Sequence, residues 1–308
     1  MNYIKFISFE LKYSNVTILN VSYFYLLFFQ RNQIKLLMRY NQTSILLFSV
    51  VALFYYCGCN ESKSFLNENL TYEMVKYHKK SVGCDSLRNE NCAEIKIEFP
   101  KISFPENKIV EEKINKTIVD FFSKDIMGGL ESVDFNTLMD GFIQDYESFK
   151  KEFPDAPQSW TVERTGEVKL NKANIFSIEY TEYVFTGGAH PNTFVSFKNF
   201  NLTNGEEITL DELISLENQN ELTKIAEKEF RKLKKLNPDD DLGKAGFWFE
   251  DDEFSLNDNF LITDNSLIFY YNNYDITAYA FGPTELIVPY SEIKSLVSEN
   301  SLLKDLVK

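Results

Sequence analysis

The chain has 308 residues, 46 of them acidic and 32 basic, so its formal net charge at pH 7 is −14. This acidity disfavours binding to nucleic acid or to anionic lipid head groups, and it favours basic partners. The length is sufficient for one large domain or two small ones, each with its own apolar core.

Residues 1–37 contain no Gly, Ala, Pro, Asp, Cys, His or Trp. We interpret this composition as upstream A/T-rich DNA translated from too early a start, and we expect translation to begin at Met38. The alternative is a membrane anchor from Val16 to Phe29. That run is 14 residues long, whereas a membrane-spanning helix needs about 20 residues.

Residues 38–58 are typical of a bacterial lipoprotein signal peptide. Arg39 precedes an apolar run over residues 44–56, which is too short to span a bilayer. Cys59 is the predicted lipidated residue, and would carry palmitate, because the small Gly58 comes directly before it. An ordinary secretory signal with incidental cysteines is the alternative.

Cleavage before Cys59 would remove five basic residues and one acidic residue, so the formal charge would change from −14 to −18. The mature chain is expected in the bacterial cell envelope, exported and anchored to the membrane by its lipid, on the periplasmic or the surface side. Residues 59–70 are polar and predict a flexible tether. In an oxidising compartment Cys84 and Cys92 are expected to form a disulfide, which would contribute about 2–3 kcal/mol.

Residues 71–155 are predicted to form an N-terminal α+β subdomain. The alternation of Ile95, Ile97 and Phe99 with charged residues favours a strand, which Pro100 is expected to end. The predicted elements are strands over 71–81 and 93–99 and helices over 107–122 and 136–152.

Residues 156–308 are predicted to form a second α+β subdomain. Asp264 and Asn265 are typical of a two-residue hairpin turn, and Ser291 is typical of a helix N-cap. Because strands and helices are mixed rather than regularly alternating, the fold class is α+β with antiparallel sheets. The predicted elements are strands over 159–170, 175–186, 193–202, 260–263, 266–271 and 286–290, and helices over 210–216, 220–236 and from 291 onward.

One candidate binding segment joins two of these strands and contains Tyr183, Gly187, Gly188 and His190. The two glycines permit positive φ angles and a close backbone approach, so they could form a ligand cradle or simply turn a hairpin. His190 could act as a general base, but no Ser or Cys nucleophile stands in a recognisable motif beside it. A hydrogen-bonded structural role for His190 is the alternative.

A second candidate binding segment, residues 270–283, is rich in tyrosine and includes Tyr274 and Tyr279. Its tyrosines could form a contact surface for a sugar or a protein. They could equally lie in a core where each hydroxyl finds a partner.

The sequence predicts no cofactor and no metal site. The acidic stretches 239–241 and 250–253 fail the calcium-loop pattern, because Leu242 and Trp248 stand where a glycine and a bidentate glutamate are needed. The two histidines, His78 and His190, lack zinc-ligand spacing.

Several motifs in a fixed order resemble the extracellular domain of unknown function of the anti-sigma factor RsiV, which is also found ahead of the catalytic domain in a peptidoglycan deacetylase. The resemblance covers about 160–302, and residues 70–150 are similar to the domain that usually precedes it. The motifs that carry it are Tyr180, Tyr183 and Gly187–His190, then Gly205–Glu206 with Leu210–Leu213, then Asn259–Ile262, Tyr274–Pro283 and Val288–Tyr290.

The resemblance implies an α+β fold and a role at the cell wall, with lysozyme, a small basic protein, as the partner in RsiV. We therefore expect a lipid-anchored envelope binding module for a basic protein such as lysozyme or for a cell-wall fragment. The candidate binding residues are Tyr183, Gly187, Gly188, His190, Tyr274 and Tyr279, and no catalytic residue is assigned. An enzyme acting on wall glycan around His190 and a purely structural lipoprotein are the alternatives.

Overall fold

The computed structural model describes residues 70–82, 84, 92–126 and 132–307. The expected early start (1–37), signal peptide (38–58), lipidated Cys59 and the tether up to residue 69 lie outside these residues. Within the described part of the chain, no helix combines the length and the apolar character needed to cross a membrane.

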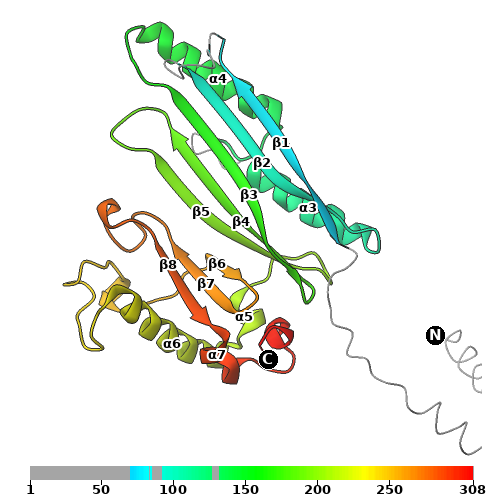
Figure 1. The fold of residues 1–308 in the computed structure, drawn as a ribbon, viewed down its shortest axis with the longest axis vertical. Helices are drawn as coiled ribbons and strands as arrows, with labels where there is room; N and C mark the ends of the chain where they lie inside the picture. The colour runs from blue at the N-terminus through cyan, green and yellow to red at the C-terminus, as the bar shows by residue number, and fades with distance from the viewer. Residues whose placement is uncertain (1–69, 83, 85–91, 127–131, 308) are drawn as a thin grey trace, which may run out of the picture. The chain divides into compact units, whose positions relative to one another are not determined.

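The larger sheet has the strand order β1-β2-β3-β4-β5 (Figure 1). The α+β class is confirmed, but β2 and β3 pair in parallel, whereas the other neighbours are antiparallel as expected. The parallel pair follows from the helical crossover between these two strands. The strands are β1 (Thr71–Lys80), β2 (Ala93–Ser103), β3 (Trp160–Lys172), β4 (Ile175–Phe185) and β5 (Asn192–Asn201).

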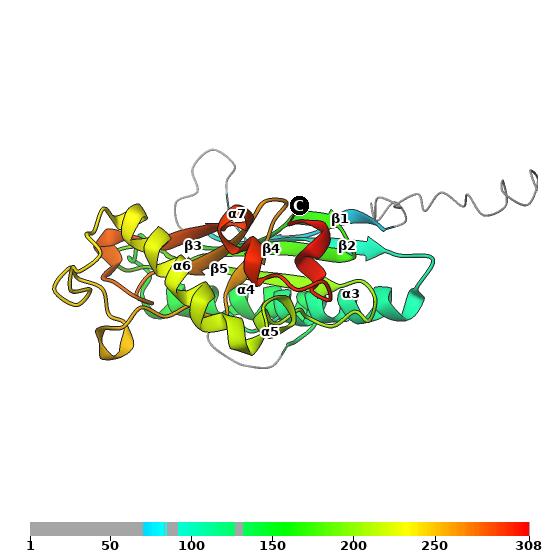
Figure 2. The same cartoon turned by 90° about the horizontal axis from the view of Figure 1, so that it is seen from below.

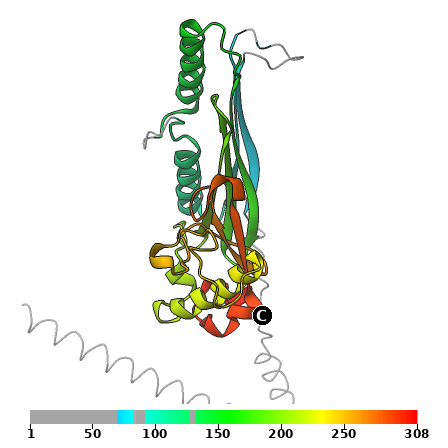
Figure 3. The same ribbon diagram turned by 90° about the vertical axis from the view of Figure 1, so that its left-hand side faces the viewer.

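Helices α3 (Lys108–Phe122) and α4 (Phe135–Glu152) form the crossover and cover one face of the larger sheet (Figure 3). Each begins at a side-chain cap, because Asn107 and Asp134 accept hydrogen bonds from backbone N–H groups of the first turn. Their apolar stripes pack on the alternating apolar residues of β2, β3 and β4 as one core. Members of this core include Ile95, Ile97, Phe99, Val110, Ile114, Phe122, Leu138, Phe142, Val162, Phe176 and Ile178.

Two residues of β3 allow α3 to end directly against the sheet. A Cβ atom on Gly166 would lie 2.7 Å from the ring of Phe122, so only glycine leaves room for that ring. Arg164, with a side chain that is 2% exposed, donates to the carbonyl of Phe122 at 2.8 Å and to the carbonyl two residues further on at 2.6 Å. These bonds satisfy carbonyls that the helix end leaves unpaired.

Two sequence-based predictions that rest on a single residue are wrong, and α5 (Leu210–Leu213) and α6 (Leu216–Lys234) end and begin three to four residues earlier than expected. Strand β2 continues through Pro100 to Ser103 and stays paired with β1 over this length. Its pairing with β3 stops at Glu98. The missing N–H of Pro100 therefore removes no hydrogen bond from the sheet. The last helix, α7 (Tyr290–Ile293), starts before Ser291 and has only four residues; its N-cap is Pro289.

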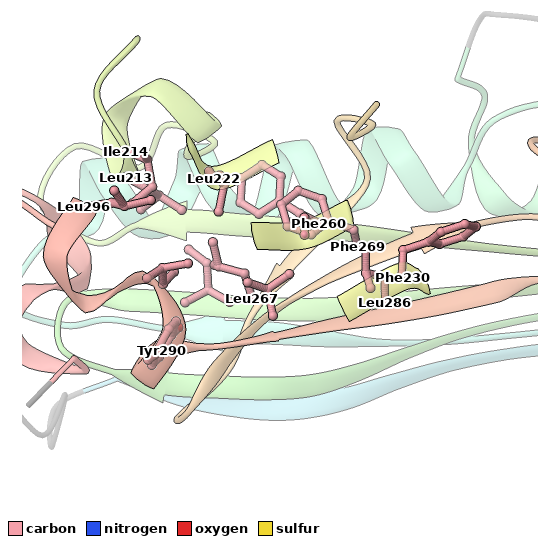
Figure 4. Packing of buried hydrophobic residues seen from close by; sticks show 14 of the residues in the cluster. Leu213, Ile214, Leu222, Phe230, Phe260, Leu267, Phe269, Leu286, Tyr290 and Leu296 are labelled. Atoms are coloured by element: carbon pink, nitrogen blue, oxygen red, sulfur yellow. The ribbon is translucent and has the colours of Figure 1, made fainter. Parts of the chain in front are cut away.

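The smaller sheet has the order β6-β7-β8, all antiparallel, with the predicted turn at residues 264–265 between its first two strands. Helix α6 packs against β8 and α7 and closes a second core (Figures 2 and 4). The core side chains labelled in Figure 4 include Leu222, Phe230, Phe260, Leu267, Phe269 and Leu286. The elements are β6 (Phe260–Ile262), β7 (Ser266–Tyr271), β8 (Thr284–Pro289), α5 (Leu210–Leu213) and α6 (Leu216–Lys234).

Asparagine side chains join the two sheets along the outer edge of β5. The amide of Asn272 accepts from the Val195 N–H at 2.7 Å and donates to the Val195 carbonyl at 2.9 Å, as a neighbouring strand would. Asn259 accepts from the N–H of Phe197 at 2.9 Å and also donates to the Val195 carbonyl at 2.9 Å. The edge of β5 is thus paired without a further strand beside it.

A third asparagine makes the reverse connection from β5 to β6. The amide of Asn199 accepts from the N–H of Ile262 at 3.0 Å and donates to the carbonyl of Phe260 at 2.7 Å. We call Asn199, Asn259 and Asn272 the asparagine junction. Beside it, Val195 and Phe197 form a small apolar cluster with residues of the smaller sheet.

The expected disulfide between Cys84 and Cys92 is confirmed, with the two Cα atoms 5.2 Å apart. This separation lies within the ordinary range for a disulfide. The bond joins the end of β1 to the start of β2, so the two strands leave this point already paired.

We predict that Asn272→Ala lowers the free energy of unfolding by about 2 kcal/mol, because the buried N–H of Val195 loses its acceptor. Chemical denaturation followed by circular dichroism measures this change. Asn192→Ala is the matched control, since Asn192 is an exposed asparagine on β5, the strand that contains Val195. This substitution should change the free energy of unfolding by less than about 0.5 kcal/mol. Equal effects of the two substitutions would contradict the role of the junction.

Candidate functional site

The first candidate segment is a hairpin connection between β4 and β5. Gly187 and Gly188 have φ angles of 104° and 106°, which L-residues rarely adopt. A Cβ atom on Gly188 would meet nothing within 4 Å, and one on Gly187 would come no nearer than 3.5 Å to Gln158. The glycines are therefore required by the turn, not by a close backbone approach.

The second candidate segment connects β7 to β8. Asn272 of the asparagine junction opens it, and its backbone N–H donates to the carboxylate of Asp275 at 2.6 Å. Tyr274 has a φ of 71°, and the residue is 56% exposed. A short 3₁₀ turn, Tyr279–Phe281, completes the connection.

The fold brings three of the predicted residues together from these two segments. The ring of His190 stacks on the ring of Tyr279, with centroids 3.9 Å apart and planes at 19°. The ring of Tyr274 lies 5.7 Å from that of Tyr279. We call His190, Tyr274 and Tyr279 the aromatic tip.

One carbonyl holds the stacked pair in place. The Nδ1–H of His190 donates to the carbonyl of Pro191 at 3.0 Å, and the hydroxyl of Tyr279 donates to the same carbonyl at 3.2 Å. The Nε2 atom of His190 is then the unprotonated nitrogen of the neutral ring. In the described residues no carboxylate bonds to this histidine, so the orientation that a catalytic histidine receives from a carboxylate is not supplied here.

The remaining tyrosines of the motif lie elsewhere. Tyr183 is on β4 opposite Thr193, and in the described part of the chain it makes no ring contact with the aromatic tip. Tyr180 is buried on the helix-covered face, where its hydroxyl donates to Glu182 at 2.8 Å. Burial raises the pKa of the Tyr180 hydroxyl, and Arg164 donates to the same carboxylate at 2.5 Å. This part of the motif is structural.

The sequence-based reading missed exposed aromatic residues around the aromatic tip. Phe281, in the 3₁₀ turn with Tyr279, is 75% exposed, and Trp248 is 54% exposed. The backbone N–H of Trp248 donates to the carbonyl of Ile276 at 2.8 Å, which places it beside this loop. The signal in the sequence that could have indicated Trp248 is its position close to the acidic run 250–253.

The other histidine belongs to the solvent face of the larger sheet. The Nε2 atom of His78 lies 2.8 Å from Glu94, which also pairs with Lys80 and Lys96. Burial acts to raise the pKa of the Glu94 carboxyl. The hydrogen bonds from His78, Lys80 and Lys96 outweigh this effect and lower that pKa below its ordinary value. Among the described residues, no group of three His, Cys, Asp or Glu side chains is placed to hold a metal ion.

Two family models match consecutive segments of the chain. One described as "Deacetylase PdaC" matches residues 87–193, and one described as "Protein of unknown function (DUF3298)" matches residues 211–291. The chain joins a PdaC-type region to a DUF3298-type region. The expected combination of an RsiV-type domain with the domain that usually precedes it is thereby confirmed. The matched spans place Gly187, Gly188 and His190 in the first region and Tyr274 and Tyr279 in the second, so the aromatic tip is built from both.

Individual relatives agree with this organisation. The chain is 24% identical over 169 residues to the peptidoglycan-N-acetylmuramic acid deacetylase PdaC of Bacillus subtilis, a match that covers 52% of this chain and 35% of the relative. The chain thus spans about a third of the length of that relative.

Two solved structures of DUF3298 family members share the fold. The protein from Bacteroides fragilis is 18% identical, with a TM-score of 0.61 over 77% of this chain and 97% of its own. The protein from Pseudomonas aeruginosa is 21% identical, with a TM-score of 0.52 over 76% of this chain and 97% of its own.

We predict that Gly188→Ala lowers the free energy of unfolding by about 1–2 kcal/mol, because the added Cβ has space but the positive φ is strained. Gly141→Ala is the matched control. A Cβ on Gly141 also meets nothing within 4 Å, but this residue lies inside α4, so alanine should stabilise by about 0.5–1 kcal/mol. Thermal unfolding of both variants checks the difference, and a neutral Gly188→Ala would contradict it.

Proposed function

We propose that this chain is a cell-envelope binding module, anchored to the membrane through Cys59, which contacts a peptidoglycan-derived ligand with its aromatic tip. The single observation that carries the proposal is the stack of the exposed His190 on the half-buried Tyr279, with the exposed Tyr274 beside it. The ligand class is suggested by the peptidoglycan named in the description of the relative PdaC.

The geometry of the aromatic tip suits binding. Tyrosine has an apolar ring and a polar hydroxyl, so it contacts ligands well at surfaces that stay partly wet. The apolar faces of sugar rings can pack on such aromatic rings. The shared carbonyl of Pro191 fixes two of the rings before a ligand arrives, and a pre-organised surface loses less entropy on binding.

The asparagine junction supports the same conclusion. Asn272 attaches the β7–β8 connection to Val195, only a few residues beyond His190. The two halves of the aromatic tip, which come from different matched regions, therefore cannot separate without breaking buried hydrogen bonds. A rigid scaffold that presents loop residues is the usual arrangement of a binding site.

The first test is cosedimentation of the full-length chain with insoluble peptidoglycan. We expect Tyr279→Ala to weaken binding about tenfold, as for a central aromatic contact residue. Tyr72→Ala is the matched control, because Tyr72 is an exposed tyrosine on β1 that packs near Phe176 at the other end of β4; it should bind as the wild type does. Absence of wild-type binding, or equal binding by the two variants, would overturn the proposal.

A second candidate ligand is a basic protein of the lysozyme class, and one observation favours it. The formal charge of the chain is −14, and the exposed acidic residues 250–253 begin two residues after the exposed Trp248. An acidic surface accelerates and strengthens association with a basic protein.

For this candidate we predict that immobilised basic lysozyme retains the chain at low salt and retains less as the salt concentration rises, because ions screen exposed charges. Bovine serum albumin, which is acidic, is the control surface. No retention at either low or moderate salt would exclude lysozyme as the ligand. It would not affect the proposal of a peptidoglycan-derived ligand.

A further inference from the structure

A small pocket lies between the segment that carries Trp248 and the β7–β8 connection, the loop that also carries Tyr274 and Tyr279. Its volume is about 250 Å³, and its lining includes Trp248, Glu250, Ser255, Asn257, Tyr271 and Asp275. Pockets that bury a whole small molecule have volumes of about 300–1,000 Å³. This pocket has the size for one chemical group of a larger ligand.

The lining of the pocket includes a hydrogen-bond acceptor that has no partner among the described residues. The side-chain N–H of Asn257 donates to the carbonyl of Tyr270 at 2.8 Å, which fixes the orientation of its amide. The Oδ1 atom of the same amide is buried and has no partner among the described residues. The hydroxyl of Tyr271 already donates to the carbonyl of Ser255 at 2.6 Å, so its proton is not available to a ligand.

The charged groups of the pocket are all negative. Glu250 and Asp275 contribute carboxylates, and no lysine, arginine or histidine is among the lining residues. Burial raises the pKa of the Tyr271 hydroxyl, and the nearby charge of Asp275 raises it further. The hydroxyl therefore stays protonated and adds no third negative charge.

The half-exposed ring of Trp248 lines the same pocket. Aromatic faces attract cations, and tryptophan does so most strongly. Two carboxylates, an unpaired amide oxygen and an indole ring together complement a cation that carries several N–H donors. An ammonium group has one positive charge and three donors.

We propose that this pocket binds the free primary ammonium group of the ligand that occupies the aromatic tip. The proposal rests on the proposed function and names the chemical group that this site selects. Two parts of peptidoglycan can supply such a group, namely an amino sugar without its acetyl group and the side chain of a diamino acid in the stem peptide. Asp275 directly follows Tyr274, so one ligand can reach both the aromatic tip and the pocket.

The test compares free amines with their acetylated counterparts. One pair of probes is glucosamine oligomers and N-acetylglucosamine oligomers. The other is Nα-acetyl-lysine amide and its Nε-acetylated form. Binding to the full-length chain is followed by tryptophan fluorescence at about pH 6, where the amines carry their proton. The chain has two tryptophans; Trp160 is buried, so a change in Trp248 dominates, and Trp248→Phe should abolish the signal.

We expect the free amine of at least one pair to bind about two- to fivefold more tightly than its acetylated form. Glu250→Gln should remove this preference, because it deletes one carboxylate of the pocket. Glu253→Gln is the matched control, a neighbouring exposed glutamate outside the pocket, and should keep the preference. A preference for the sugar pair alone assigns the group to the glycan, and a preference for the lysine pair alone assigns it to the stem peptide.

Equal binding of free and acetylated forms, or an unchanged preference in Glu250→Gln, would overturn the proposal. So would the absence of binding by all four probes. Cosedimentation with peptidoglycan is run in parallel on the same protein. Retained cosedimentation with no amine preference removes the pocket proposal alone, whereas loss of both removes the proposed function as well.

Discussion

The asparagine junction is the interaction on which the candidate site depends. An edge strand carries a row of N–H and C=O groups that must be paired if the edge is covered. Here the edge of β5 is covered by the smaller sheet, and the amides of Asn259 and Asn272 replace the missing backbone partner of β5. The amide of Asn199 on β5 does the same for the backbone of β6. A side-chain amide has the same donor and acceptor as a peptide group, so it can complete a strand edge without a strand. The junction thereby sets the register between β5 and the smaller sheet.

The aromatic tip follows from this register. His190 precedes β5 and Tyr279 lies in the β7–β8 connection, so their stacking requires that these loops meet at one end of the two sheets. Both rings then bond to the carbonyl of Pro191. The adjacent acidic pocket follows for the same reason, because Asp275 belongs to the loop that Asn272 holds. The stacked rings and the carboxylate of Asp275 thus lie in loops that one set of buried hydrogen bonds holds in place.

The helix-covered half of the larger sheet contributes stability. Arg164 connects β3, the end of α3 and the Tyr180–Glu182 pair in a buried polar network. Such a network is stabilising only when every member is paired, since an unpaired buried charge is costly. Part of the motif that carries the family resemblance therefore preserves the fold, and another part forms the aromatic tip. The two roles lie in different elements, because Tyr180 and Glu182 are on β4, whereas His190 lies in the connection that follows it.

The sequence by itself determined the local features of this protein. The 2-residue and 3.6-residue periodicities located most strands and helices, the spacing of Cys84 and Cys92 indicated their disulfide, and the paired glycines indicated positive φ angles at the β4–β5 turn. The sequence-based predictions were wrong at Pro100, where β2 continues, and at Ser291, which is not the helix N-cap. At these two positions the pairing of a strand edge and the packing of the C-terminal segment overrode local preference. The tertiary structure alone decided that His190 meets Tyr279, that Tyr183 stays apart from them, and that Trp248, Asn257 and Asp275 share a pocket. His190 and Tyr279, and likewise Trp248 and Asp275, are tens of residues apart in the sequence. Their meeting depends on which side-chain amides complete the edge of β5, a choice that no local pattern encodes.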